Sequence, residues 1–166
     1  MSAAATKGVV YLHACPPAIA PHVEWALAGV LGSAVRMEWT AQPASPASLR
    51  AEATWVGRIG TGSRLAAALR AWPMLVFEVT EDGTSLSDGE RVSYMPGRGF
   101  HRSMTASNGD IVIDEERLRG LVDRARDAQD FRHGLAELLG SSWDAELEPY
   151  RTGAWGEPVT LLHQVV

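Results

Sequence analysis

The order of strand and helix patterns in the first half of the sequence restricts the fold more than any other feature. Residues 8–14 form a continuous apolar run, which is typical of a central strand covered on both faces. After this run, apolar residues at helical spacing predict a helix, two segments of period-two alternation predict two strands, and an alanine-rich segment predicts a second helix. Glycine and proline residues mark the boundaries of these segments. The expected elements are a strand, a helix, two strands, a helix and a strand over residues 8–14, 21–31, 34–40, 49–56, 64–72 and 74–80.

This order predicts an α+β fold. It is the order of a ferredoxin-like βαββαβ unit, in which two helices cover one face of a four-stranded antiparallel sheet. We expect this unit to occupy residues 1–82. In its hairpin, a register that joins opposite charges on the solvent side also joins apolar side chains on the buried side. The expected facing pairs are Arg36 with Glu52, Glu38 with Arg50, and Met37 with Ala51.

Residues 83–166 predict additional strands, a helical segment and a terminal strand within the same compact domain. The strands are expected over residues 91–95, 100–105, 111–113 and 158–166, and helices follow Asp114 and cover 131–139 and 143–148. Asp114 is a typical N-cap, Ser142 is expected to cap the short third helix, and Pro149 to end it. The apolar side chains expected to face inward are Leu118, Leu121, Val122 and Ala125, then Phe131, Leu135, Leu138 and Leu139.

Composition excludes several classes of protein. The formal net charge is -5, so a general nucleic-acid binder is not expected, because phosphate binding needs a concentrated basic surface. No apolar run approaches the ~20 residues that span a bilayer, and the first residues lack the apolar core of a signal peptide. A single cysteine, Cys15, excludes an internal disulfide framework and a four-cysteine zinc site. We therefore expect a cytoplasmic protein with no membrane contact.

Charge is divided unevenly along the chain. Residues 1–80 carry six basic and four acidic side chains, whereas residues 81–166 carry nine basic and sixteen acidic ones. Opposite net charges suggest two parts that attract each other or present different faces to partners. The alternative is an ordinary solvated acidic surface.

A glycine-rich loop precedes the second predicted helix. Its exposed N–H groups and basic side chains could hold a phosphate or carboxylate. The candidate anion-binding residues are Arg58, Gly60, Gly62, Ser63 and Arg64. The loop is not a P-loop, since no Lys-Ser/Thr pair follows the glycines, and it misses the acetyltransferase pyrophosphate motif by one residue. A plain turn with a helix cap is the alternative interpretation.

A cysteine and two histidines lie close in sequence after the first strand. Cys15 and His13 or His22 could form a thiolate–imidazole nucleophile, since a helix N-terminus lowers a thiol pKa. Cysteine followed by two prolines is more often a small buried hydrophobe. The three residues also lack the fourth ligand and spacing of a structural zinc site. We predict no catalytic residue, no metal and no cofactor.

Aromatic and basic side chains supply candidates for partner binding. His22 and Trp25 stand three residues apart and share one flank of a helix, and six tryptophans exceed what a core of this size needs. The other candidates are Trp143 and Trp155 as exposed anchors, and Tyr94, Arg98, His101 and Arg102 around the turn at residues 96–99. Internal packing of the rings and an ordinary exposed hairpin are the alternatives.

Four segments resemble a known family. They are residues 8–13, 20–32, 143–150 and 158–166. They look like an actinobacterial family catalogued as domain of unknown function 3145, over a stretch from Gly8 to the C-terminus. The resemblance implies a compact cytoplasmic protein with no established reaction and a link to fatty-acid synthesis and acyl-CoA carboxylation. It supplies no catalytic residues.

The first functional hypothesis is a non-catalytic accessory or regulatory subunit of a larger enzyme of acyl-CoA carboxylation or fatty-acid synthesis. The tryptophan surplus, the divided charge and the absence of catalytic sequence motifs favour it. The alternative is a small acyl-CoA- or anion-binding enzyme or sensor that uses the loop at residues 57–64. A homodimer formed through an open sheet edge is a third hypothesis.

Overall fold

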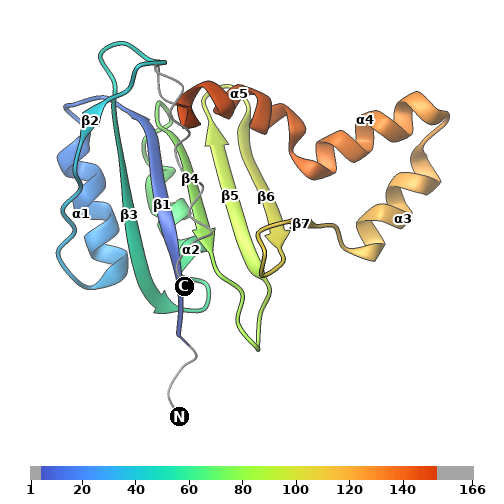
Figure 1. Ribbon diagram of the computed structural model, residues 1–166, viewed down its shortest axis with the longest axis horizontal. Coiled ribbons are helices and arrows are strands. Elements are labelled where there is room, and N and C mark those ends of the chain that lie inside the picture. Colours follow the sequence, from blue (N-terminus) through green and yellow to red (C-terminus); the bar gives the residue numbers. More distant parts are fainter. Residues whose placement is uncertain (1–4, 153–166) are drawn as a thin grey trace.

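The computed structural model describes residues 5–152, and its strands form one antiparallel sheet in the order β2-β3-β1-β4-β5-β6-β7 (Figure 1). The strands are β1 (Ala5–Cys15), β2 (Thr40–Ala41), β3 (Leu49–Arg58), β4 (Val76–Glu81), β5 (Gly89–Met95), β6 (Gly99–Thr105) and β7 (Ile111–Val112). The helices are α1 (Ala20–Leu31), α2 (Thr61–Leu69), α3 (Glu115–Arg124), α4 (Ala128–Leu139) and α5 (Ser141–Arg151). The α+β class predicted from the sequence is confirmed. Because β4 pairs with β5, the two halves of the chain share this sheet.

Helices α1 and α2 cover one face of the sheet, and α5 lies across one end of the other (Figure 1). Alternation along the central strand β1 places Val10 and Leu12 on the helix-covered face and His13 on the second face. The core under the helices contains Val23 and Leu27 of α1, Leu65 and Leu69 of α2, and Phe77 and Val79 of β4. The observed order of elements, β1-α1-β2-β3-α2-β4, is the order predicted for residues 8–80.

The predicted hairpin register is wrong. Residues 34–39 are not a strand, and in the two-residue β2 it is Thr40 that faces Arg50. The side chain of Glu24 on α1 explains the difference, because it accepts hydrogen bonds from the backbone N–H of Met37 at 2.9 Å and from Trp39 Nε1 at 3.1 Å. The segment is thus bonded to the helix. The pairs expected for Arg36 and Glu38 do not form.

The helical segment differs from the prediction in where its apolar side chains lie. Asp114 caps α3 as expected, accepting from the N–H of Arg117 at 2.8 Å. Of the four α3 side chains expected to face inward, however, only Leu121 is buried, whereas Leu118 is 38% and Val122 is 58% exposed. Helices α3 and α4 contact each other and extend away from the sheet (Figure 1).

The last helix is longer than predicted. Helix α5 begins after Gly140 instead of at a Ser142 cap, and it continues past Pro149 to Arg151. A proline inside a helix costs about 3 kcal/mol, so tertiary contacts must offset it. The buried pairing of Arg151 in the last turn supplies such a contact. The predicted strand over residues 158–166 lies outside the described residues, as does Trp155.

We expect Gly8→Ala to lower the free energy of unfolding by about 1–3 kcal/mol, because the new methyl group overpacks the sheet. A Cβ at Gly8 would lie 1.9 Å from the carbonyl oxygen of Thr80 and 2.7 Å from Trp55 Cζ2. Urea unfolding followed by circular dichroism measures the change. The matched control is Gly29→Ala within α1, where a Cβ meets no atom within 4 Å and should raise stability by about 0.5–1 kcal/mol. Equal effects of the two variants would contradict this account of Gly8.

Candidate functional site

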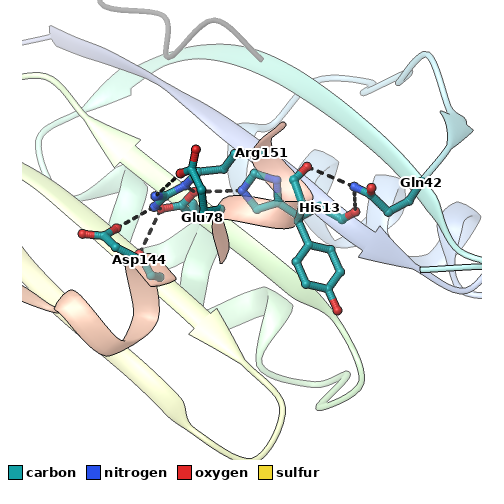
Figure 2. Close-up of polar contacts among 8 residues, drawn as sticks. His13, Gln42, Glu78, Asp144 and Arg151 are labelled. Carbon is teal, nitrogen blue, oxygen red and sulfur yellow. Dashed lines mark hydrogen bonds and ion pairs between the residues drawn. The ribbon is translucent and has the colours of Figure 1, made fainter. Parts of the chain in front are cut away.

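A buried carboxylate, Glu78 of β4, joins three strands to α5 (Figure 2). Its Oε2 accepts from His13 Nε2 at 2.8 Å and from Arg151 Nε at 2.9 Å. Its Oε1 accepts from Ser93 Oγ at 3.1 Å and from the second guanidinium nitrogen of Arg151. The same guanidinium donates to Asp144 at 2.9 Å within α5. Glu78 therefore receives four hydrogen bonds from β1, β5 and α5.

The pKa of Glu78 reflects this arrangement. Burial alone would raise the pKa, but the hydrogen bonds from His13 and Arg151, together with the charge of Arg151, outweigh it and hold the pKa well below its usual range. The carboxylate is thus charged at neutral pH, and its oxygens are already occupied by protein donors. Such a closed network suits a structural anchor better than proton transfer, which needs a group that changes its protonation near the working pH.

Further contacts hold α5 against the same end of the sheet. Leu147 is fully buried against Ala14, Val76 and Met95, which form a small second core. Trp143 Nε1 donates to the carbonyl oxygen of Gly99 at 3.0 Å. Gln42 Nε2 bridges the carbonyl oxygens of His13 at 2.7 Å and Tyr150 at 3.2 Å (Figure 2).

The glycine-rich loop already holds an anion of the protein itself. The carboxylate of Glu81 accepts from the N–H of Gly60 and of Gly62, both at 2.7 Å, at the N-terminus of α2. Ser63 donates to Glu90 at 2.8 Å, and Arg64 donates to Thr61 at 3.0 Å. The side chain of Arg58 is exposed and forms no hydrogen bond or ion pair with another described residue. An external phosphate would therefore have to displace Glu81, a residue that the sequence analysis did not single out because it lies on a different strand.

The structure separates the cysteine from the histidines. Cys15 lies in the core under the helices, where burial raises the pKa of its thiol to about 11. His13 lies on the other face of the sheet, bound to Glu78. The thiolate–imidazole pair considered from the sequence is not formed, and Cys15 packs as a small buried hydrophobe. His22 and Trp25 do lie together on α1, with their rings edge to face at 5.6 Å and Trp25 73% exposed.

The residues around the turn at 96–99 are divided between the two faces. The His101 ring packs against Trp143 in a tilted arrangement with the centroids 4.8 Å apart, and Arg98 lies 5.4 Å from the centroid of the same indole and pairs with Glu146 of α5. Burial, reinforced by the charge of Arg117, lowers the pKa of His101. On the helix-covered face, Tyr94 packs against Phe77 and Phe100, and Arg102 pairs with Glu90. These side chains, predicted as one partner-binding tip, are mostly engaged within the protein.

Helices α3 and α4 form a projecting unit, here called the arm (residues 115–139). Leu121 is its only buried residue, and it packs so closely on Gly134 that an added Cβ would lie 2.2 Å from it. Apolar side chains are otherwise exposed or half-buried along the arm: Leu118, Val122, Phe131, Leu135, Leu138 and Leu139. The sequence pattern identified these residues as apolar stripes, but assigned them to the core.

Within residues 5–152, no group of three histidine, cysteine, aspartate or glutamate side chains is placed to hold a metal ion. Within the same range, no helix combines the length and apolar character needed to cross a membrane.

These features define an α+β protein whose residues 5–152 form one seven-stranded sheet and an anchored helical arm. A family model described as "Protein of unknown function (DUF3145)" matches residues 9–164. The chain belongs to this family, as the resemblance in the sequence implied. No curated protein and no solved structure matches the chain.

We expect Arg151→Met to destabilise the protein by about 3–5 kcal/mol, because it leaves the charge of Glu78 buried with fewer donors. Thermal and urea unfolding measure the loss. The control is Arg119→Met, which removes an exposed pair with Glu115 on the arm and should cost less than about 0.5 kcal/mol. If Arg151→Met and Arg119→Met are equally stable, Glu78 and Arg151 do not anchor α5.

Proposed function

We propose that this protein is a non-catalytic accessory subunit that binds a larger enzyme through its arm. The observation that carries the proposal is the exposure of the arm's apolar side chains, in particular Val122 at 58% and Leu118 at 38%. No residue of α4 is buried, although the helix contains Phe131 and three leucines. Leu118 and Val122 stand one helical turn apart on α3 and so share one face, and an exposed apolar face on a folded protein is a candidate interaction site.

The length of the arm's helices supports the proposal. Helix α3 has 10 residues and α4 has 12, and helices shorter than about 12–15 residues are marginal in water unless they pack on something. In the structure α3 packs on α4, and α4 also contacts α5. A partner that covers their apolar flank would stabilise the helices and gain the free energy of burying that flank.

The partner follows from the family resemblance: an enzyme of acyl-CoA carboxylation or fatty-acid synthesis in an actinobacterial host. The state of the candidate nucleophile supports a binding role over a catalytic one, because the raised pKa of Cys15 keeps its thiol protonated at neutral pH. A single cysteine that stays reduced also suits the cytoplasm, where we place the protein.

We further propose that residues 1–82 form the ferredoxin-like unit, to which β5, β6, β7 and the three later helices are additions. The strand order β2-β3-β1-β4, with α1 and α2 on one face, supports this assignment.

The edge strands of the sheet are relevant to the homodimer hypothesis. Both edge strands, β2 and β7, are two residues long, and such short edges offer little for pairing with a second copy.

The alternative function, an acyl-CoA- or anion-binding enzyme or sensor, would use the loop at residues 57–64. It requires an anion that competes with Glu81 for the N–H groups of Gly60 and Gly62. Calorimetry with coenzyme A distinguishes this function from the accessory subunit, for which no heat of binding at the loop is expected.

We expect Val122→Glu to weaken binding to the purified acyl-CoA carboxylase holoenzyme by about tenfold or more, because it places a charge in the apolar contact. Biolayer interferometry with the full-length protein measures the affinity. The matched control is Leu86→Glu, since Leu86 is 76% exposed and lies in the loop between β4 and β5, far along the chain from the arm. Circular dichroism establishes that both variants fold.

Two results would contradict the proposal in different ways. Equal binding by Val122→Glu and wild type would remove the arm from the interface. The association of the carboxylase subunits with one another is the positive control for the assay. If that association is detected and the wild-type protein still does not bind the carboxylase, the carboxylase is not the partner.

A further inference from the structure

A groove of about 430 Å³ lies on the second face of the sheet, at the end away from α5. Its walls are the turn after β4 and the loop that follows β6. Its lining includes Lys7, Val9, Thr54, Val56, Thr80 and Arg91. Its volume falls within the range of small-molecule sites, roughly 300–1,000 Å³.

Strand register brings the two basic side chains of the groove toward one point. Val9 of β1 pairs with Thr80 of β4, and Thr80 pairs with Arg91 of β5, so these three residues share one row across the sheet. Lys7 lies two residues before Val9 on the same face. Strand spacing and rise place the Cα atoms of Lys7 and Arg91 about 12 Å apart, a distance that two long side chains can close around one anion.

Neither basic side chain has an acidic partner among residues 5–152. The structure gives no hydrogen bond or ion pair to the side chain of Lys7 or of Arg91, although acidic residues line the same groove. Glu81 is occupied by the N–H groups of the glycine loop, and Glu90 by Arg102 and Ser63. Asp82 is exposed and forms no ion pair with either base.

A third unpaired donor lies beside Arg91. Ser103 of β6 faces Arg91 in the register and is 5% exposed, and its hydroxyl has no hydrogen-bond partner among the described residues. Buried hydroxyls are normally paired, because an unpaired one costs free energy. Ser103 does not itself line the groove, so the two bases that do, Lys7 and Arg91, are the groups that favour an oxyanion there.

The other side of the groove is apolar. Val56 is 74% exposed and pairs with Lys7, and Val9 pairs with Thr54. The valine side chains and the threonine methyl groups form a surface on which an alkyl chain could lie.

We propose that the groove binds a small amphiphile, an oxyanion carried on a short alkyl chain. The oxyanion, a carboxylate or a phosphate, lies between Lys7 and Arg91. The alkyl chain extends over Val9 and Val56. This site is independent of the arm and of the accessory role proposed above.

Isothermal titration of the full-length protein with octanoate and with octyl phosphate tests the site, and the better of the two identifies the headgroup. We expect saturable binding of at least one, with Arg91→Met and Lys7→Met each weakening it about tenfold or more. Octanol, which lacks the charge, and inorganic phosphate, which lacks the chain, should bind at least tenfold more weakly than the amphiphile.

Arg50→Met is the matched control for the loss of a basic side chain. Arg50 lies on β3, is half-buried and lacks an ion-pair partner among the described residues, but does not line the groove. Val56→Trp is a second variant that fills the groove while keeping both bases, and it should also abolish binding. No saturable binding of either amphiphile below about 1 mM, equal loss in Arg50→Met, or equal affinity for octanol would overturn the proposal.

Discussion

The charge of Glu78 determines how the two halves of this protein fit together. A carboxylate that is 3% exposed is stable only when its oxygens are fully hydrogen-bonded. The donors come from β1, from β5 and, above all, from Arg151 at the end of α5. Because this pairing fixes α5 across the sheet, it also fixes the point from which α3 and α4 project. The anchor is thus the physical link between the sheet and the arm.

Local sequence patterns predicted the elements better than their partners. The alternation in residues 49–56 and the capping pattern after Asp114 depend on neighbours in sequence, and both are confirmed. The register error at residues 34–39 arose because Glu24, a helix residue, competes for that backbone. The alternation of apolar and polar residues depends only on residues 34–40 themselves. It therefore cannot show that a distant helix residue, Glu24, will accept a hydrogen bond from this backbone.

The candidate sites show the same limit. Residues chosen for their chemistry, such as those of the glycine loop and the turn at 96–99, are largely paired within the protein: Gly60 and Gly62 with Glu81, and Arg98 with Glu146. The arm and the groove, where side chains lack partners in the described part of the chain, contain ordinary valines, leucines and bases. Their lack of partners depends on the position of the whole helix or strand, which residue type does not reveal. The periodicity did identify the arm's apolar stripes, and only the packing showed that they do not reach the core.

Amide hydrogen exchange of the free protein tests the central claim most directly, because it measures the opening of each helix separately. If Glu78 and Arg151 fix α5 to the sheet while the arm lacks a partner, α5 should open only together with β1 and β4. The amides of residues 115–139 should then exchange through a separate opening of lower free energy. Exchange of α5 at the rate of the arm, or protection of the arm equal to that of β1, would contradict the account.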